Sequence, residues 1–329
     1  MRLTALLRRA QGKIGGQKVA QGASVPAPIE GWDAVSPIAA MSPKRAVRMD
    51  NWFPQPDWVE LRRGFVLHVT TVSSSPIETL ATYTGISSNK MFAAVADIIV
   101  DVTSASSAPA SVSGLTNARF QHVNFATTGG NFLYMVNGAD LPRYYDGAVW
   151  AAPTITGITA EDAIGIAVHK NRLWFVLNDS SDAAYLDVDS IQGAATVFPL
   201  GGNWSLGGFL MAIASWSLDA GDGPDDYLAF ISSRGQVSVF KGIDPDTDFE
   251  IVGTYSIGAP IGRRCVTKVG ADVAVICNDG VVPLSKALIY ERAAVSKVTM
   301  TQRIQRVMNE SARSFKNNFG WQLISYPRG

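Results

Sequence analysis

The sequence predicts an all-β fold, and three features of the chain lead to that prediction. Short apolar or alternating runs rich in Val, Ile, Phe, Tyr and Trp recur between about Pro56 and Leu288. Gly, Asn, Asp and Ser separate these runs, as they do at the turns between β-strands. Several runs are followed by a polar turn and then by a second run, which is the pattern of a hairpin.

The hairpins form a repeat. One apolar residue from each copy can serve as an anchor, and the anchors follow one another at intervals of about 40–50 residues, a period typical of propeller blades. We therefore expect a β-propeller-like domain of about five to six blades, in preference to an irregular two-sheet β-sandwich with similarly spaced hairpins. The anchors are Phe92, Leu133, Trp174, Leu228 and Val275.

This domain is expected to span residues 67–329, with an apparently incomplete last blade. A further copy begins at Trp321, yet the chain stops at Gly329. Two explanations stay open: the chain is a shortened form of a longer one, or an N-terminal strand such as Trp58 to Leu61 completes the blade. One inserted helix is predicted over Thr301 to Asn317, because four apolar residues recur there at helical spacing: Ile304, Val307, Met308 and Phe315.

The segment before the domain divides into two parts. Residues 1–30 carry only positive charges before Glu30 and are rich in Gly, Gln and Ala. Such a composition buries too little apolar surface to fold alone, so we expect a flexible cationic arm that could meet phosphates non-specifically. Residues 31–66 are expected to form an N-terminal strap. The cations of the arm are Arg2, Arg8, Arg9, Lys13 and Lys18.

Composition bounds the function classes. Lys+Arg and Asp+Glu balance at 28 each, so the whole chain is no polyelectrolyte partner for nucleic acid. Charged residues make up only 17% of the chain, which favours a surface covered by neighbours in an assembly. No apolar stretch reaches the roughly 18 residues of a membrane-spanning segment, so we expect no membrane insertion.

The sequence gives no catalytic constellation. His68, His122 and His169 are scattered, and no hydrolase, metalloprotease or phosphate-loop motif occurs. We therefore expect no enzyme, no catalytic residues and no cofactor. The segment Asp244 to Asp248 alternates like a calcium loop but lacks the Gly and Glu that the loop requires, and Asp219 to Asp226 reads as a solvated turn, so we expect no metal site.

Residues 28–65 carry the most specific motif of the chain. It includes Gly31-Trp32, Ala39-Ala40-Met41, Asp50 to Pro54 and Leu61 to Phe65. This stretch resembles the opening of the tail-nozzle, or packaged-DNA-stabilisation, family of short-tailed bacteriophages. Its aromatic side chains are of the kind that carry much of the energy where chains meet. The candidate interface residues are Trp32, Asp50, Asn51, Trp52, Phe53, Pro54, Arg62, Gly64 and Phe65.

The resemblance implies a virion structural protein of the tail, assembled in the host cytoplasm. It implies a homo-oligomeric ring, expected to be a hexamer, that lies below the head-to-tail adaptor and contacts other tail proteins. The ring would extend the DNA channel and help retain the packaged genome, which it would touch non-specifically in a neutral or acidic lumen. Two alternatives stay open: a receptor- or glycan-binding, even glycan-cleaving, tail propeller, and a host-side propeller scaffold.

Overall fold

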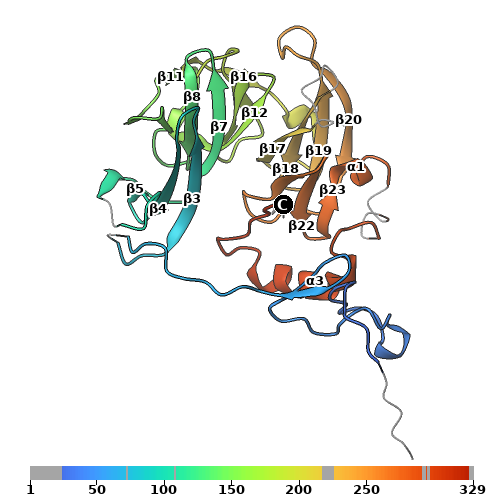
Figure 1. Ribbon diagram of the computed structural model, residues 1–329. Coiled ribbons are helices and arrows are strands. Elements are labelled where there is room, and N and C mark those ends of the chain that lie inside the picture. The colour runs from blue at the N-terminus through green and yellow to red at the C-terminus, as the bar shows by residue number, and fades with distance from the viewer. Residues whose placement is uncertain are drawn as a thin grey trace, which may run out of the picture. The chain divides into compact units, whose positions relative to one another are not determined.

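The computed structural model describes residues 24–325, apart from positions 72, 107–108, 217–225, 291–293 and 295–296 (Figure 1). Contacts divide the chain into a unit that ends at Arg62 and a larger unit that begins at Arg63. Most of the arm expected over residues 1–30 lies outside the described residues. The part of it that is described, from residue 24 to residue 30, contains no helix and no strand.

The smaller unit is held together by one hairpin and one bridge. Strands β1 (Trp52–Pro54) and β2 (Val59–Leu61) pair in antiparallel fashion, and a short 3-10 helix, η1 (Ile38–Ala40), precedes them. Asn51 enters β1 with a positive φ of 61°, a backbone conformation in which Asn is among the least strained residues. Because β2 pairs with β1 in this two-stranded sheet, the described structure does not use Trp58 to Leu61 to complete a blade.

The larger unit contains five antiparallel sheets that follow one another along the chain, here called the first to the fifth sheet. The first comprises β3 (Ile77–Thr84), β4 (Asn89–Val95), β5 (Ile98–Asp101) and β6 (Ala110–Val112). The second comprises β7 (Gln121–Thr127), β8 (Gly130–Val136), β9 (Arg143–Tyr145) and β10 (Trp150–Ala151). The third comprises β12 (Ala163–His169), β13 (Arg172–Leu177), β14 (Ala183–Tyr185) and β16 (Thr196–Phe198).

The fourth sheet comprises β17 (Leu210–Trp216), β18 (Tyr227–Ser232), β19 (Gln236–Lys241) and β20 (Glu250–Ser256), and the fifth comprises β21 (Val266–Val269), β22 (Asp272–Cys277) and β23 (Gly280–Pro283). A parallel pair, β11 (Ile155–Thr156) with β15 (Gly193–Ala194), lies outside these sheets. The helices whose bounds lie within the described residues of this unit are η2 (Ala160–Asp162), η3 (Gly201–Asn203), α1 (Leu284–Ala287), η4 (Gln302–Ile304) and α3 (Gln305–Phe315). Within the described ranges, none of the helices has the length and apolar character that a membrane crossing needs.

The first strand of each sheet packs against the first strand of the next: β3 against β7, β7 against β12, β12 against β17, and β17 against β21. This is the arrangement of propeller blades, in which the leading strands face a common axis. The predicted all-β, propeller-like fold is therefore confirmed. The repeat also has the predicted register, because all five anchors lie in the second strand of their sheets and are buried.

Apolar layers between consecutive sheets form the core. Between the third and fourth sheets, Trp174 is surrounded by aromatic rings of both sheets, including Tyr185 at 4.8 Å and Phe230 at 5.6 Å between ring centroids. A second layer joins the fourth sheet to the fifth and contains Trp216, Cys265 and Cys277. Both thiols are buried, and Cys277 Sγ donates to the Gly280 carbonyl at 3.3 Å.

The end of the chain differs from the prediction. The expected helix exists, but as η4 followed by α3, and its Met308 packs against the core of the fourth and fifth sheets. The segment from Trp321 to Ser325 forms no strand and so begins no further sheet within the described residues. Instead, Gln322 makes a parallel bridge to Arg264 beside the fifth sheet, because the apolar side chains of Trp321 and Leu323 pack onto the core there.

Candidate functional site

The hairpin of the smaller unit presents an apolar groove. Trp52 and Trp58 line a cavity of about 530 Å³ together with Pro28, Met49 and Val59. Trp52 is 48% exposed and Trp58 56% exposed, well above what packing within a domain normally leaves of a Trp side chain. Exposed aromatic side chains around a groove are typical of a surface that another molecule covers.

The structure brings together most of the interface residues predicted from the sequence. Asp50, Asn51, Trp52, Phe53 and Pro54 form the first arm of the hairpin and the turn into it. Arg62 closes the other arm: its backbone N–H and its Nε both donate to Asn51, to the carbonyl oxygen at 2.6 Å and to Oδ1 at 3.0 Å.

Three of the predicted interface residues lie apart from the hairpin. Trp32 lies beside Ala46, where its indole N–H donates to the Val47 carbonyl. Gly64 and Phe65 belong to the larger unit, and the Phe65 side chain is exposed there.

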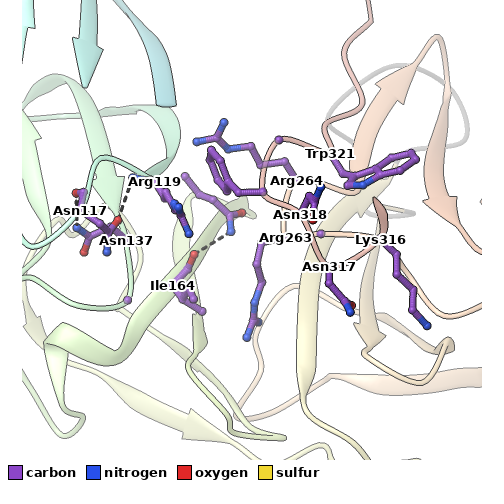
Figure 2. Close-up of a pocket in the computed structure, with 15 residues that line it drawn as sticks. Asn117, Arg119, Asn137, Ile164, Arg263, Arg264, Lys316, Asn317, Asn318 and Trp321 are labelled. Carbon is purple, nitrogen blue, oxygen red and sulfur yellow. Dashed lines mark hydrogen bonds between the residues drawn. The ribbon is translucent and has the colours of Figure 1, made fainter. Parts of the chain in front are cut away.

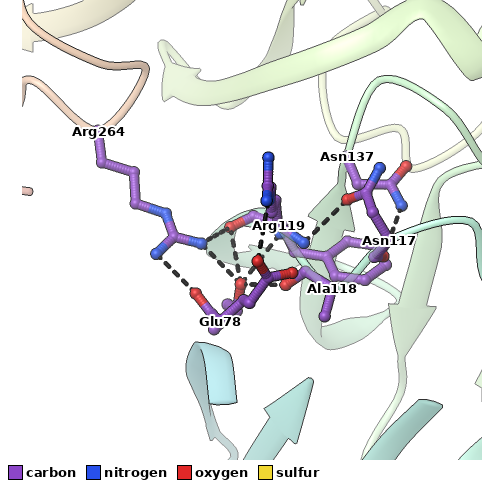
Figure 3. A network of polar contacts seen from close by, with 8 residues as sticks. Glu78, Asn117, Ala118, Arg119, Asn137 and Arg264 are labelled. Atoms are coloured by element: carbon purple, nitrogen blue, oxygen red, sulfur yellow. Dashed lines mark hydrogen bonds and ion pairs between the residues drawn. The ribbon is translucent and has the colours of Figure 1, made fainter. Parts of the chain in front are cut away.

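A second site lies inside the larger unit, where the fifth sheet meets the first and second sheets; we call this junction the seam. At the seam, β21 and β3 do not pack closely in the way that the other neighbouring first strands do. The Arg264 guanidinium connects the sheets instead (Figure 3). Its Nη1 donates to the Glu78 carbonyl at 3.0 Å, and its Nη2 donates to Thr79 Oγ1 at 2.6 Å and to the Phe120 carbonyl at 2.7 Å.

The partners of Arg264 are themselves fixed. Thr79 Oγ1 donates to the Ala118 carbonyl at 2.6 Å and accepts the Phe120 N–H at 3.0 Å. Arg119 Nε donates to Glu78 Oε1 at 2.9 Å. Both guanidinium groups lie over the Phe319 ring, that of Arg119 at 4.6 Å and that of Arg264 at 5.3 Å from its centroid. The seam is therefore closed by cationic and polar contacts rather than by an apolar layer.

A pocket of about 440 Å³ opens at the seam (Figure 2). Asn117, Asn137 and Ile164 lie on one side of it, and Lys316, Asn317 and Trp321 on the other. Arg263 also lines it; its Nη1 donates to the Leu210 carbonyl at 2.8 Å, and its guanidinium lies 4.8 Å from the centre of the Phe209 ring. Gly138 contributes to the wall with a φ of 71°, and a Cβ there would lie 2.7 Å from Ile164, so the two sheets could not approach as closely with another residue.

Sequence reasoning missed this pocket. Arg263 and Arg264, which both line it, were not among the candidate residues predicted from the sequence. The residues that line the pocket contribute guanidinium, ammonium and amide groups, and no carboxylate is among them. The sequence signal that was present is two adjacent arginines next to Cys265, which is buried, and a charged residue near a buried position needs a partner across the fold.

One serine–histidine pair lies within the propeller. His169 Nδ1 is 2.9 Å from Ser215 Oγ, and Ser215 lines a second pocket near His122. Burial lowers the pKa of His169 to about 4, and its Nε2 is buried with no hydrogen-bond partner among the described atoms. Among the described residues, no acidic group hydrogen-bonds that nitrogen, as the third member of a hydrolytic triad would.

Two histidines, the buried His169 and the half-buried His122, give the chain a pH-dependent stability. Burial lowers the pKa of His122 to about 4, with a further contribution from the nearby positive charge of Arg264, and lowers that of His169 to about 4. Between pH 6.5 and 4 the unfolded chain binds more protons than the folded one, so the free energy of unfolding should fall as the pH falls. The slope should reach about 1.4 kcal/mol per pH unit for each histidine and level off below pH 4.

Urea denaturation at several pH values would measure this slope. The double variant H122Q/H169Q should be less sensitive to pH over the same range, whereas H68Q, which changes a histidine bound to the Val102 carbonyl, serves as the control. Identical slopes for the wild type and the double variant would contradict the prediction.

The acidic segment Asp244 to Asp248 is used within the fold. The Asp248 carboxylate accepts the backbone N–H groups of Ile243 and Asp244, and Asp244 accepts a hydrogen bond from Arg172 Nη2 at 3.2 Å. Asp246 accepts the Tyr185 hydroxyl. In the part of the chain that the structure describes, no group of three or more His, Cys, Asp or Glu side chains is arranged to hold a metal ion. The Asp219 to Asp226 turn lies outside the described residues except for Asp226.

No protein-family model and no curated protein matches the chain. Among solved structures, BBS1N in complex with ARL6DN is 12% identical, with a TM-score of 0.36 over 64% of this chain and 77% of that one. A quinonprotein alcohol dehydrogenase-like protein from Bacteroides thetaiotaomicron is 14% identical, with a TM-score of 0.38 over 64% of this chain and 53% of that one. At these scores the likeness carries no argument about function.

Proposed function

We propose that this chain is a structural subunit of the tail of a short-tailed bacteriophage, which assembles into a ring below the head-to-tail adaptor. In the virion the ring would extend the DNA channel and help retain the packaged genome. The observation that carries the proposal is the exposed aromatic hairpin of the smaller unit. The segment from Asp50 to Pro54 carries the family-like motif, and Trp52 within it lines an apolar groove together with Trp58.

The two units suit different parts of this role. Five sheets with apolar layers between them make a stiff scaffold, because each sheet is buried against the next. The hairpin instead leaves Trp52, Phe53 and Trp58 between 39% and 56% exposed. Large aromatic side chains exposed in one place are the usual anchors of a protein–protein interface. We propose that a second copy of the chain occupies this groove. Association only in the presence of the adaptor would instead assign the groove to the adaptor.

Native mass measurement of the purified protein, alone and mixed with the adaptor ring, tests this function. The wild type should form a closed ring, expected to be a hexamer, on its own or on the adaptor. The double variant W52A/W58A should weaken that association by about a thousandfold, because interface anchors of this kind are worth about 2 kcal/mol or more each. Its melting temperature should stay near that of the wild type, since both side chains are largely exposed.

A matched control is I86A, which removes an exposed apolar side chain from the turn between β3 and β4. It should assemble like the wild type. A wild-type protein that stays monomeric and does not respond to the adaptor would refute the proposed function.

A further inference from the structure

The seam pocket has an unbalanced charge. Arg119, Arg263, Arg264 and Lys316 line it, and no Asp or Glu does. Of the four cations, Arg119 is paired with a carboxylate, that of Glu78. In the described part of the chain, Arg263, Arg264 and Lys316 make no ion pair, and the two arginines donate to neutral oxygen atoms instead.

Two of these cations are partly withdrawn from water. Burial lowers the pKa of both Arg263 and Arg264, and the more distant charges of Asp179 and Glu78 offset this only in part. Removing a guanidinium group from water without a direct counter-ion costs free energy. A bound anion would offset this cost by pairing with the positive charge. The other acid near the pocket, Asp140, is held through the Asn137 amide and does not line the cavity.

The remaining lining groups are suited to binding an oxyanion. Asn117, Asn317 and Asn318 add amide groups, and amide N–H groups donate hydrogen bonds as the guanidinium and ammonium groups do. Guanidinium and ammonium groups make charge-assisted hydrogen bonds to phosphate oxygens, and a lysine adds a mobile charge. The volume of about 440 Å³ falls within the range of small-molecule sites and is large for a single phosphate group.

We propose that the seam pocket is a binding site for a small polyphosphate anion, with Arg263, Arg264 and Lys316 as its charge partners. The ligand would contact the fifth sheet through the two arginines and the segment after α3 through Lys316. Because Arg264 also holds the first and second sheets, occupation of the pocket would hold the seam closed and stabilise the folded chain. This inference does not depend on whether the chain forms a ring.

Calorimetric titration with tripolyphosphate, pyrophosphate and inorganic phosphate, at constant ionic strength set with sodium chloride, tests the site. Affinity should rise from phosphate to tripolyphosphate, and tripolyphosphate should raise the melting temperature. Adenosine triphosphate as a further titrant distinguishes a free polyphosphate from a nucleotide, since tighter binding than tripolyphosphate would assign a contribution to the base. Either result supports the polyphosphate site.

The variant K316Q should raise the dissociation constant for tripolyphosphate about tenfold, because one charge-assisted contact is lost. Lys316 is exposed, so this substitution should not disturb folding. The matched control K286Q changes an exposed lysine of α1 that lies outside the pocket, and it should bind like the wild type. No binding at millimolar tripolyphosphate, or equal losses in K316Q and K286Q, would overturn the proposal.

Discussion

Replacement of Arg264 with glutamine is expected to lower the free energy of unfolding by about 3 kcal/mol, because several charge-assisted hydrogen bonds are lost together. Its guanidinium satisfies the carbonyls of Glu78 and Phe120 and the hydroxyl of Thr79, which belong to β3 and to the start of the second sheet. The glutamine side chain is shorter, and its amide NH2 group offers only two N–H donors for three oxygen atoms. It would leave at least one of these oxygen atoms without its donor.

Denaturation in urea, followed by circular dichroism, measures the loss. R264K, which keeps the charge but not the planar fork, should recover part of it, since lysine cannot donate to three oxygen atoms in that geometry. R313Q is the control, because Arg313 is an exposed arginine on α3. A loss in R264Q no larger than that in R313Q would show that the seam does not depend on this side chain.

The fold could be predicted from the sequence because its signal is local and repeated. Each copy contains an apolar second strand, a polar turn and a third strand. The second strands are buried on both faces, as Leu133 and Tyr134 of β8 show, so their runs are continuously apolar. The position of α3 followed from the same reasoning, since the 3.6-residue period is also a local property.

The seam could not be predicted in this way. Arg264 and Thr79 are separated by 185 positions, and no local pattern indicates that they meet. The sequence pattern at Trp321 was that of a new strand, yet Gln322 bridges Arg264, because Trp321 and Leu323 pack onto the layer between the fourth and fifth sheets. An apolar run is equally compatible with a strand and with an irregular segment that caps a sheet. Tertiary packing decides between them.

The hairpin of the smaller unit lies between these two cases. Trp52 and Phe53 were interface candidates from the sequence. What the sequence could not show is that Trp52 and Trp58 line one groove, a consequence of the pairing between β1 and β2.

The aromatic layer between the third and fourth sheets is expected to contribute strongly to the stability of the fold. Trp174 is fully buried, lies parallel to Phe249 at 5.8 Å, and contacts Tyr185, Phe198 and Phe230. W174A should lower the free energy of unfolding by about 4 kcal/mol or more, since truncation to alanine leaves a cavity that rings from two sheets line.

The phenylalanine variant of the same residue separates packing from hydrogen bonding. The Trp174 Nε1 is buried and has no hydrogen-bond partner among the described atoms, so W174F removes a polar group that is already unsatisfied. W174F should therefore lower the free energy of unfolding by about 1.5 kcal/mol or less, which is well below the loss in W174A. Urea denaturation of the two variants and the wild type measures both losses. If W174F were as destabilising as W174A, the indole N–H would have to be satisfied in solution, and the layer would not be the packed apolar core that the contacts indicate.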